Sequence, residues 1–547
     1  MDVHPAPSGK SCGLQRRHFL AASAMSLIGC EQARDIAGGF TGINVERGHL
    51  LRDRAHWPPP SRTFTTGVLI AGGGVAGLAA ARALRLKGRD DFALLELEDA
   101  AGGNSRGGSV MGLACPLGAH YLPVPGDDAP EVQDLLEELG LRQRVAGRWQ
   151  YDERHLCHSP QERLFFNGAW QDGLLPVQGV GADTLAQYQK FAGLVEQLQQ
   201  QGKWTIPVSN RPIVPVQRSL LAITFESYLR QQGLTDQHLR WYLNYCCRDD
   251  YGAGLATVSA WAGLHYFASR HGFHAPGQDG GEREREGVLT WAEGNGWLTQ
   301  RLAAPLGERL HTGRVVLRIA QARHGVEVDA FNTQTQAVER WQARRAIVAL
   351  PVAVAARVVQ NPPDFLRQAA ARTIYAPWLV ANLHIHTPLF DRPGPAPSWD
   401  NVLYGTPGLG YVNARHQSLQ PVPGATVLTY YRPLGDEPGG PGAGRRLLLT
   451  KPWGAWRDEI LAELALAHPD LPGKTSRIDI TRYGHAMAVP VPHISSKIGL
   501  KPLSGMKSSL YKNDRLVIAH ECLHFAHSDW AGYSVFEEAF TLGHGAA

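Results

Sequence analysis

Apolar and polar positions follow a recognisable order between residues 67 and 108. Val68–Ala71 is a short apolar run of the length typical of a buried parallel strand. Apolar residues and alanines then recur at helical spacing over Leu78–Leu86, and a second apolar run follows at Phe92–Leu95. This order predicts a strand–helix–strand unit that belongs to a parallel sheet.

The same criteria divide the rest of the chain. Residues 142–284 are predicted to be mostly helical, and Ala182–Gln201 is their longest amphipathic segment. Further helices are expected at Glu131–Leu141 and Ala455–Ala467. Apolar runs typical of strands are found at Val315–Ile319, Val326–Val328, Arg345–Leu350, Trp378–His386, Thr426–Tyr431 and Arg515–Ala519.

Three glycines connect the first predicted strand to the first helix. Gly72, Gly74 and Gly77 have the spacing G-x-G-x-x-G. The first glycine permits a tight turn, the second lets the backbone approach a pyrophosphate, and the third lets helix and strand pack closely. Glu96 ends the second apolar run, where an acid accepts hydrogen bonds from ribose hydroxyls. Together these features predict a dinucleotide site at the helix N-terminus.

Composition excludes several classes of protein. The chain has 547 residues, of which 44% are hydrophobic and 19% are charged, so it is long enough for two or more domains and is not disordered throughout. The formal net charge is only +4, and no basic run contains interleaved aromatic residues. We therefore expect no nucleic-acid partner. The sequence does not indicate an oligomeric state.

The first thirty residues are typical of an export signal. Arg16 and Arg17 form a twin-arginine pair before Phe19–Ile28, an apolar segment shorter than the roughly 20 residues needed to cross a bilayer. Leu27–Cys30 resembles the lipobox of bacterial lipoproteins, in which the cysteine is lipidated. Because twin-arginine export carries folded proteins, it suits an enzyme that binds its cofactor in the cytoplasm. We expect a periplasm-facing protein, held at the membrane only by acyl chains on Cys30.

Three further segments carry a resemblance to one family. Gly102–Arg106 (GGNSR) resembles the paired-glycine motif of flavoproteins, and Cys115–Tyr121 resembles the segment that passes the flavin ring. Trp530–Ala539 resembles the closing W-x-G-Y motif. The chain is thereby similar to the flavin-containing amine oxidase and phytoene desaturase-like superfamily. The resemblance implies FAD as the cofactor. His520 is a departure, because the family usually has glycine there.

The resemblance also implies the fold and its division. We expect an α/β protein with a Rossmann-like FAD-binding domain and a discontinuous α+β substrate domain. The expected order is a signal (1–30), a linker (31–63), a first FAD-binding segment (64–125), a first and mostly helical substrate segment (126–286), a second FAD-binding segment (287–360), a second substrate segment (361–504) and a third FAD-binding segment (505–547).

Positions that match the family motifs imply roles for individual residues. Val316 would lie against the adenine, and Glu521 would accept a ribityl hydroxyl. Tyr533 would form a wall of an aromatic cage, and His386 stands where monoamine oxidases have a lysine. The expected FAD contacts are Gly72, Gly74, Gly77, Glu96, Gly102, Gly103, Arg106, Gly118, Ala119, His120, Val316, Glu521, Gly532 and Tyr533. The catalytic candidates are Tyr533, His386 and Trp530. Ile480–His493 resembles the approach to the covalent flavin attachment of monoamine oxidases. No cysteine occurs in this segment, so FAD is expected to bind without a covalent link.

The tail contains a competing motif. His520–His524 (HECLH) satisfies H-E-x-x-H, and His527 would supply the third ligand of a zinc hydrolase. That site needs both histidines on one face of a helix, whereas this motif directly follows a predicted strand. The flavin motif also gives Glu521 another role. We therefore expect no metal.

The chemistry implied by the resemblance is hydride transfer from a substrate carbon to flavin N5. Our first hypothesis is oxidation of an amine-like small-molecule substrate, with oxygen, a quinone or another electron carrier as acceptor. Arg482–Ala488 resembles the desaturase and protoporphyrinogen-oxidase members, so dehydrogenation of a carbon–carbon bond is the alternative. A flavoprotein that only binds or rearranges its ligand is a third hypothesis, because fold does not fix function.

Overall fold

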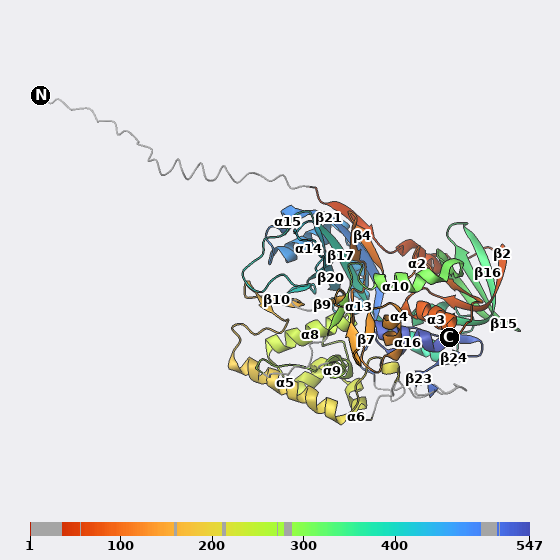
Figure 1. Cartoon of the computed structure of the whole chain (residues 1–547), viewed down its shortest axis with the longest axis horizontal. Helices are drawn as coiled ribbons and strands as arrows, with labels where there is room; N and C mark the ends of the chain where they lie inside the picture. The colour runs from red at the N-terminus through yellow and green to blue at the C-terminus, as the bar shows by residue number, and fades with distance from the viewer. Residues whose placement is uncertain are drawn as a thin grey trace.

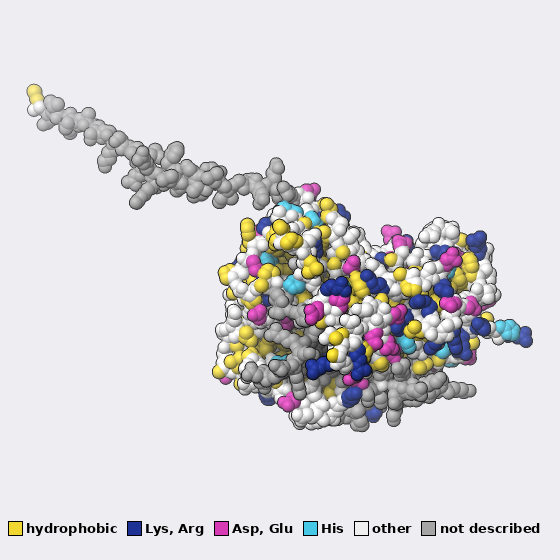
Figure 2. All heavy atoms as spheres, in the orientation of Figure 1, with side chains coloured by type: hydrophobic (Ala, Val, Ile, Leu, Met, Phe, Trp, Pro, Cys, Tyr) yellow, Lys and Arg dark blue, Asp and Glu magenta, His cyan; other side chains and the backbone are white. Residues whose placement is uncertain are grey.

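The computed structural model has two lobes, each built around a large sheet (Figure 1). It describes residues 1, 35–54, 56–157, 161–210, 215–270, 272–277, 287–493, 511–512 and 515–547. The predicted export signal, with Arg16, Arg17 and Cys30, therefore lies outside the described residues apart from Met1. Within the described chain, no helix has both the length and the apolar character needed to span a membrane. Acidic and basic side chains are interspersed over the face drawn in Figure 2.

The lobe on the right in Figure 1 contains the nucleotide-type sheet. Its strands are β2 (Arg62–Ala71), β3 (Phe92–Leu95), β13 (Leu310–His311), β14 (Arg314–Ala322), β15 (Gly325–Asn332), β16 (Ala337–Val348), β24 (Ile518–His520) and β25 (Leu523–Phe525). β13, β3, β2 and β16 are neighbours in that order and run parallel. The first half of β16 pairs with the antiparallel strand β15, and its last three residues pair in parallel with β25.

Helices cover both faces of this sheet. On one face lie α3 (Val75–Leu86), α4 (Pro130–Glu138), α10 (Gly296–Ala303) and α16 (Phe536–Ala546), and the other hydrophobic layer includes α11 (Val352–Val358) and α12 (Asp364–Arg372). The alanines of α3 are almost fully buried, which allows close approach of other backbones. At the contact with α16, a Cβ on Gly543 would lie only 2.1 Å from the carbonyl oxygen of Ala76. Small residues therefore fix the position of the C-terminal helix.

The second sheet forms the core of the substrate lobe. Its strands, in spatial order, are β1 (Ala37–Thr41), β21 (Thr475–Val489), β17 (Ile374–Ile385), β20 (Thr426–Pro433), β19 (Tyr411–Asn413), β18 (Asp400–Leu403), β10 (Glu162–Phe166) and β11 (Ala169–Asp172). Every residue of β17 after Ile374 is buried, as expected for a central strand covered on both faces. The accompanying helices are α13 (Gly440–Thr450), α14 (Trp453–Ala465) and α15 (Leu471–Lys474).

A helical layer from residues 182–268 completes the substrate lobe. It contains α5 (Ala182–Gln201), α6 (Pro215–Arg218), α7 (Phe225–Gln231), α8 (Gln237–Tyr251) and α9 (Ala260–Ala268), with single 3-10 turns η1 (Val208–Asn210) and η2 (Ser219–Ala222). Aromatic side chains dominate its core; for example, the rings of Phe191 and Phe267 meet edge to face at 5.4 Å. The helices lie below the sheet in Figure 1.

The remaining elements are short. They are α2 (Val45–Asp53), η3 (Ala304–Arg309), η4 (Ser528–Ala531), the pairs β4 (Gly107–Val110) with β5 (Leu113–Pro116), β7 (Arg142–Val145) with β8 (Arg148–Tyr151) and β22 (Tyr511–Lys512) with β23 (Arg515–Leu516), and a sheet of β6 (Tyr121–Pro123), β12 (Val288–Thr290) and β9 (Leu156–Cys157).

The predicted fold class is confirmed, with three local corrections. Residues 142–284 were expected to be mostly helical, but their first part forms the strands β7 to β11 between Arg142 and Asp172. Residues 31–63 were expected to be a linker, but Ala37–Thr41 forms β1 on the edge of the substrate sheet and Val45–Asp53 forms α2. Arg515–Ala519 was expected to be the last strand of the nucleotide domain. It is β25, further along the chain, that joins the parallel sheet, and β24 folds back on β25 as the other arm of a hairpin.

Candidate active site

The glycine-rich turn between β2 and α3 is fixed by backbone contacts. Gly72 has φ +104°, a conformation that side-chain-bearing residues rarely adopt, and a Cβ there would lie 2.4 Å from the carbonyl oxygen of Ala349. A Cβ on Gly77 would lie 1.9 Å from the carbonyl oxygen of Gly72. Gly77 does not itself line a cavity. Its absent side chain lets α3 pack directly on the turn.

Gly74 and Gly103 face each other across a narrow cradle. Gly74 is the N-cap of α3, and no side chain caps the helix there, so the first backbone N–H groups of α3 are available to a ligand. A Cβ on Gly74 would meet nothing closer than the Cα of Gly103 at 3.9 Å. Gly102 and Gly103 both have positive φ, +136° and +58°. Such a helix N-terminus favours a phosphate group.

Glu96 lies at the end of β3 beside the cradle. Its two carboxylate oxygens accept hydrogen bonds from the backbone N–H groups of Gly73 and Glu98, each at 2.8 Å. Burial raises the pKa of Glu96, and these two backbone donors oppose that shift. The second acid, Glu98, lies 3.7 Å from the Arg106 guanidinium. Arg106 thus holds the loop and does not line the cavity.

The cradle opens into a cavity of about 500 Å³ between the two lobes. Segments from distant regions of the chain line it, including the start of α3, the loop after β3, the bend of β21 and the start of α16. The predicted cofactor residues that line it are Gly72, Gly74, Glu96, Gly102, Gly103, Gly118, Ala119, His120 and Val316. These predicted residues come from three segments of the sequence, 72–103, 118–120 and the region of Val316, and the structure brings them around one cavity.

The segment of residues 116–118 is held at the cavity by the substrate sheet. Its three consecutive carbonyl groups accept hydrogen bonds, in order, from Asn382 Nδ2 (3.0 Å), Tyr483 Oη (2.8 Å) and Tyr431 Oη (3.0 Å). The two donors on β17 and β20 are buried, as is Tyr483 on β21. The substrate lobe thus fixes a loop of the nucleotide lobe.

Aromatic rings form the wall that follows this segment. His120 stacks on Tyr431 with 4.3 Å between ring centroids, and Tyr121, Trp378 and Tyr375 also line the cavity. Burial lowers the pKa of His120 to about 3, so its imidazole is neutral near pH 7. The wall is therefore aromatic and carries no positive charge.

Asp529 is an acid that the C-terminal segment places at the cavity. It follows β25, and its Oδ2 accepts hydrogen bonds from the backbone N–H of Val352 (2.9 Å) and from Tyr375 Oη (2.5 Å). Burial alone would raise the pKa of Asp529, but neighbouring His527 and these hydrogen bonds hold it below its usual range.

Glu521 was expected in this position, and that placement was wrong. Glu521 occupies the turn of the β24–β25 hairpin with φ +53°; its side chain is exposed and does not line the cavity. The sequence shows two acids that each follow an apolar run. Only the second of those runs pairs with β16, so Asp529, and not Glu521, reaches the cavity.

Tyr533 and Gly532 do not line the cavity either. Tyr533 is 1% exposed, and its hydroxyl donates to Glu538 Oε1 at 2.9 Å. Gly532 has φ +89° and ends the short helix η4. The expected role of Tyr533 as a cage wall is therefore corrected to a core role, because its ring points into the helical layer against Tyr251 and His265.

The other two catalytic candidates also lie elsewhere. Trp530 packs against Phe525 and Phe365 on the far hydrophobic layer of the nucleotide sheet. His386 directly follows β17, and its backbone N–H donates to the carbonyl oxygen of Lys474. Neither residue lines the cavity, so both catalytic assignments were wrong.

The H-E-x-x-H motif does not form a metal-binding helix. His520 belongs to β24 and His524 to β25, and these strands are antiparallel arms of one hairpin. Within the described residues of the chain, no group of three His, Cys, Asp or Glu side chains is arranged to hold a metal ion.

Sequence reasoning missed six charged residues of the cavity, of which Asp529 is described above and Arg314 begins β14. Asp249 and Asp250 lie near the end of α8, Arg270 follows α9, and Glu537 lies in the first turn of α16. The sequence signal was a pair of adjacent acids at the end of a helix that contains several aromatic residues. Their convergence depends on tertiary packing between segments almost 300 residues apart.

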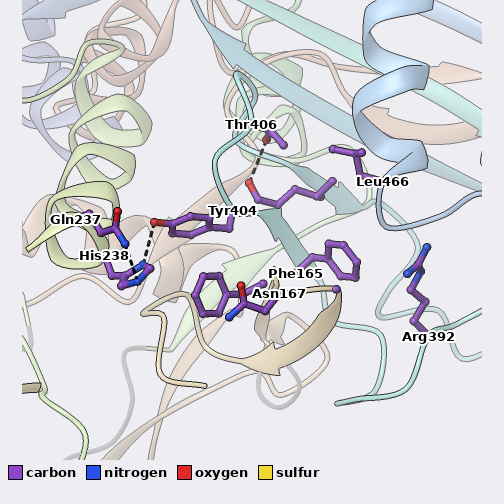
Figure 3. A pocket seen from close by; sticks show the side chains of 11 residues that line it. Phe165, Asn167, Gln237, His238, Arg392, Tyr404, Thr406 and Leu466 are labelled. Carbon is purple, nitrogen blue, oxygen red and sulfur yellow. Dashed lines mark hydrogen bonds between the residues drawn. The ribbon is translucent and has the colours of Figure 1, made fainter. Parts of the chain in front are cut away.

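A second hollow lies on the substrate lobe. Its volume is about 430 Å³, and its lining includes Phe165, Arg392 and Leu466. In Figure 3, Tyr404 and His238 point toward one another across it, and the His238 Nδ1 to Tyr404 Oη distance is 2.9 Å. None of its lining residues is shared with the larger cavity, so it is not part of the candidate active site.

Comparison with known proteins agrees with this architecture. The family model for flavin containing amine oxidoreductases matches residues 75–547. The chain is 27% identical to an L-amino acid dehydrogenase of Synechocystis sp. over 304 residues, covering 54% of this chain and 58% of that protein. It is 26% identical to the flavin-containing amine oxidase B of Cavia porcellus over 301 residues, covering 54% and 52%. The matches thus span little more than half of these relatives.

Solved structures show the same fold. A putrescine oxidase has a TM-score of 0.62 at 17% identity, covering 88% of this chain and 98% of that one. Cyclohexylamine oxidase from Brevibacterium oxydans IH-35A has a TM-score of 0.62 at 16% identity, with coverage of 88% and 98%. At such low identities, the likeness concerns the fold alone.

The glycine cradle, Glu96 and the cavity define a dinucleotide-binding protein. The chain belongs to the family of flavin-containing amine oxidoreductases, and its cofactor is FAD. The residues present fit that cofactor: the uncapped N-terminus of α3 suits a pyrophosphate, and a side chain on Gly74 would fill the space between Gly74 and Gly103.

Proposed function

We propose that this protein oxidises an amine at the carbon next to nitrogen. The observation that carries the proposal is the continuity of one cavity, which runs from the glycine cradle to an aromatic wall and a cluster of charged side chains. When bound, FAD supplies the acceptor for a hydride from the substrate carbon, which leaves an imine that water hydrolyses.

The chain's own groups would bind and orient the two reactants. Gly74, Gly103 and the N-terminus of α3 would hold the pyrophosphate, and Glu96 would accept the ribose hydroxyls. Asp529 would make the ribityl contact that was expected of Glu521, because Asp529 follows β25 and lines the cavity whereas Glu521 does not. None of the described lining residues is a cysteine, which supports non-covalent binding.

The aromatic wall would keep the reacting nitrogen neutral. An amine must lose its proton before a hydride can leave the adjacent carbon, and a wall without charge favours the neutral form. His120, Tyr431 and Trp378 provide such a wall, since burial keeps His120 uncharged. The charged groups elsewhere in the cavity argue against the alternative of desaturating a wholly apolar substrate.

The electron acceptor and the location belong to the same proposal. We propose oxygen, a quinone or another carrier as the acceptor, and export by the twin-arginine route with a lipid anchor at Cys30. The order of Arg16, Arg17, the apolar segment and Cys30 supports this. Mass spectrometry of protein from membranes would test it. An unmodified Cys30 within an uncleaved N-terminus would contradict it.

The test is anaerobic reduction of the bound flavin. Purified protein is first acid-precipitated, and its flavin bands are expected to move wholly into the supernatant. A panel of amines is added without oxygen to a separate, native portion of the protein, and bleaching of the flavin absorbance is followed. Reduction by an amine supports the proposal. Failure of every amine, with the flavin still reducible by dithionite, would overturn it.

A further inference from the structure

The most exposed apolar side chains of the described chain lie on three loops. Apart from the terminal Met1, the four highest exposed fractions among the large hydrophobic residues belong to Leu419 (93%), Val422 (74%), Phe390 (73%) and Met111 (65%). Leu419 and Val422 lie in the loop between β19 and β20. Phe390 lies between β17 and β18, and Met111 is at the turn between β4 and β5. Single exposed apolar residues are common on protein surfaces, so the positions of these four relative to one another decide what they mean.

Strand pairing places two of these loops at one end of the substrate sheet. Ile385, the last residue of β17, pairs with Thr426, the first residue of β20, and with Thr475, the first residue of β21. The loop that precedes β20 and the loop that follows β17 therefore leave the sheet at the same end. These are the loops that carry Leu419 and Phe390.

Side-chain contacts hold Phe390 and the β4–β5 hairpin at that end. The Lys474 ammonium lies 3.8 Å from the centroid of the Phe390 ring, and Lys474 directly precedes β21. Val110, next to Met111, packs in a small apolar cluster with Val427, the second residue of β20. All three loops thus border one end of the sheet. We call the surface formed by their four exposed side chains the apolar rim.

The loop with the two most exposed side chains is held by its own arginine. The Arg415 guanidinium donates hydrogen bonds to the carbonyl oxygen of Ala425 at 3.2 Å and to Gln420 Oε1 at 2.6 Å. These bonds join the two sides of the loop that carries Leu419 and Val422. Residues 417–425 contain no charged side chain. The loop therefore presents an uncharged, apolar tip.

The chain enters the sheet at the same end. β1 begins at Ala37, which pairs with Arg477 near the start of β21. In Figure 1 this red strand begins at the top of the left lobe, near the labels of α15 and β21. Asp35 is the first described residue after Met1, and Cys30 stands five positions before it in the sequence. The chain that leads from the proposed lipid anchor therefore enters beside the apolar rim.

We propose that the apolar rim docks on the surface of a lipid bilayer, with its four side chains inserted between the lipid headgroups. Apolar side chains that leave water in this way stabilise the bound state in proportion to the area they bury. The Lys474 ammonium beside Phe390 is paired with Asp470 at 2.7 Å, so the rim offers apolar area rather than charge. This contact goes beyond the proposed oxidation and adds a protein surface to the acyl chains expected at Cys30.

The first test maps the surface that touches lipid. Full-length Cys30→Ser, loaded with FAD, is incubated with or without vesicles of phosphatidylethanolamine and phosphatidylglycerol, and amide hydrogen exchange is followed by mass spectrometry. We expect exchange in residues 416–424 and 387–392 to slow about tenfold on vesicles. The exposed turn at residues 334–336 of the nucleotide lobe is the control and should not change. Protein that stays unbound, or bound protein with unchanged exchange at the rim, would overturn the proposal.

Substitutions measure how much the rim contributes. Leu419→Ser and Phe390→Ser remove exposed side chains, so folding should be kept, and each should lower the partition onto vesicles about tenfold. Leu86→Ser is the matched control, because Leu86 is 61% exposed at the end of α3 in the nucleotide lobe. All variants keep the same N-terminus, so its own affinity for lipid cancels. Equal partition of the three variants would contradict the assignment.

The charge of the lipid and the self-association of the protein test the occupant. Partition should be similar on vesicles of phosphatidylcholine and should change little with added salt, because the rim acts through apolar area. Binding that needs anionic lipid and is lost in salt would overturn the proposed mode of docking. Light scattering without lipid tests a second copy of the chain. Self-association that Leu419→Ser abolishes, without vesicle binding, would assign the rim to that copy instead.

The test is separate from that of the proposed function. None of the four rim residues lines the cavity, so Leu419→Ser should keep the parent rate of flavin reduction by an amine in the absence of vesicles. Vesicle binding without reduction by any amine would support the rim and overturn amine oxidation. Reduction by an amine without vesicle binding would do the reverse.

Discussion

The hydroxyl of Tyr431 donates a hydrogen bond to the carbonyl oxygen of Gly118 at 3.0 Å, across 313 residues of sequence. Tyr431 belongs to the substrate sheet, and Gly118 belongs to the loop that the nucleotide lobe presents to the cavity. This buried bond ties the position of the aromatic wall to the position of the cofactor loop. The two lobes therefore form the active site together.

Removing that hydroxyl should loosen the connection. In Tyr431→Phe, the carbonyl of Gly118 loses a buried donor, which costs about 1–3 kcal/mol in the free energy of unfolding. Thermal or urea unfolding measures the loss. Tyr228→Phe is the control, because Tyr228 is buried in the helical layer and does not line the cavity. Equal stability of the two variants would show that the bond contributes little.

The cradle predicts loss of flavin from a single substitution. In Gly74→Val, the side chain would enter the space between Gly74 and Gly103, so FAD retention should fall roughly tenfold or more. The ratio of absorbance at the flavin band to that at 280 nm measures retention. Gly193→Val is the control, because a Cβ at Gly193 in α5 meets nothing within 4 Å. A normal flavin content in folded Gly74→Val would contradict the placement.

Asp529 and Glu521 form a matched pair of acids, one inside the cavity and one outside it. Asp529→Asn should weaken FAD retention by about 10-fold, since a charge-assisted contact to a hydroxyl is lost. Glu521→Gln should retain FAD like the unmodified protein, because Glu521 is exposed at a hairpin turn. Equilibrium dialysis of FAD measures both. The reverse result would restore the assignment to Glu521.

Glu537 predicts a pH dependence of stability. Its folded-state pKa is raised to about 7, so the folded protein binds a proton that the unfolded chain releases nearer pH 4.5. The resulting stabilisation is fully present below pH 4.5 and is lost as the pH rises through about 7. The groups facing Glu537 are Arg270, Asp250 and Glu538. Unfolding free energies between pH 5 and 8 should fall less steeply in Glu537→Gln, with a difference of about 1–3 kcal/mol. Parallel slopes would show that Glu537 does not titrate in this range.

Tyr533 should affect stability rather than turnover. In Tyr533→Phe, the buried hydrogen bond to Glu538 is lost, at a cost of about 1–2 kcal/mol. Because Tyr533 does not line the cavity, the rate of flavin reduction per bound flavin should stay the same. Stopped-flow reduction and thermal unfolding measure the two effects separately. A large fall in rate without a fall in stability would return Tyr533 to the active site.

Local patterns were sufficient for the nucleotide unit and for one long helix of the substrate lobe. The strand at Phe92–Leu95 and the helix at Ala182–Gln201 have the predicted bounds, because apolar periodicity and burial agree there. Gly72, Gly74 and Glu96 were identifiable because the turn, the close approach and the ribose contact all depend on residues near one another in sequence.

Sequence patterns were insufficient where the site depends on long-range pairing. Glu521 and Asp529 both follow short apolar runs, and only the pairing of β25 with β16 decides between them. Asp249 on α8 and Glu537 on α16 line the same cavity, a placement that no local sequence pattern predicts. His386 was misplaced for the same reason, since its position relative to the cavity depends on the register of β17 in an eight-stranded sheet.

The first strand has a consequence for how the molecule would sit at a membrane. β1 begins at Ala37 and pairs in parallel with β21, so the chain enters the substrate sheet soon after Cys30. About seven residues at full extension reach only about 25 Å. The proposed acyl anchor on Cys30 would therefore be joined to the edge of the substrate sheet by a short segment of chain. The protein would be held by its substrate lobe at the bilayer surface, with limited freedom to turn the nucleotide lobe toward the lipid.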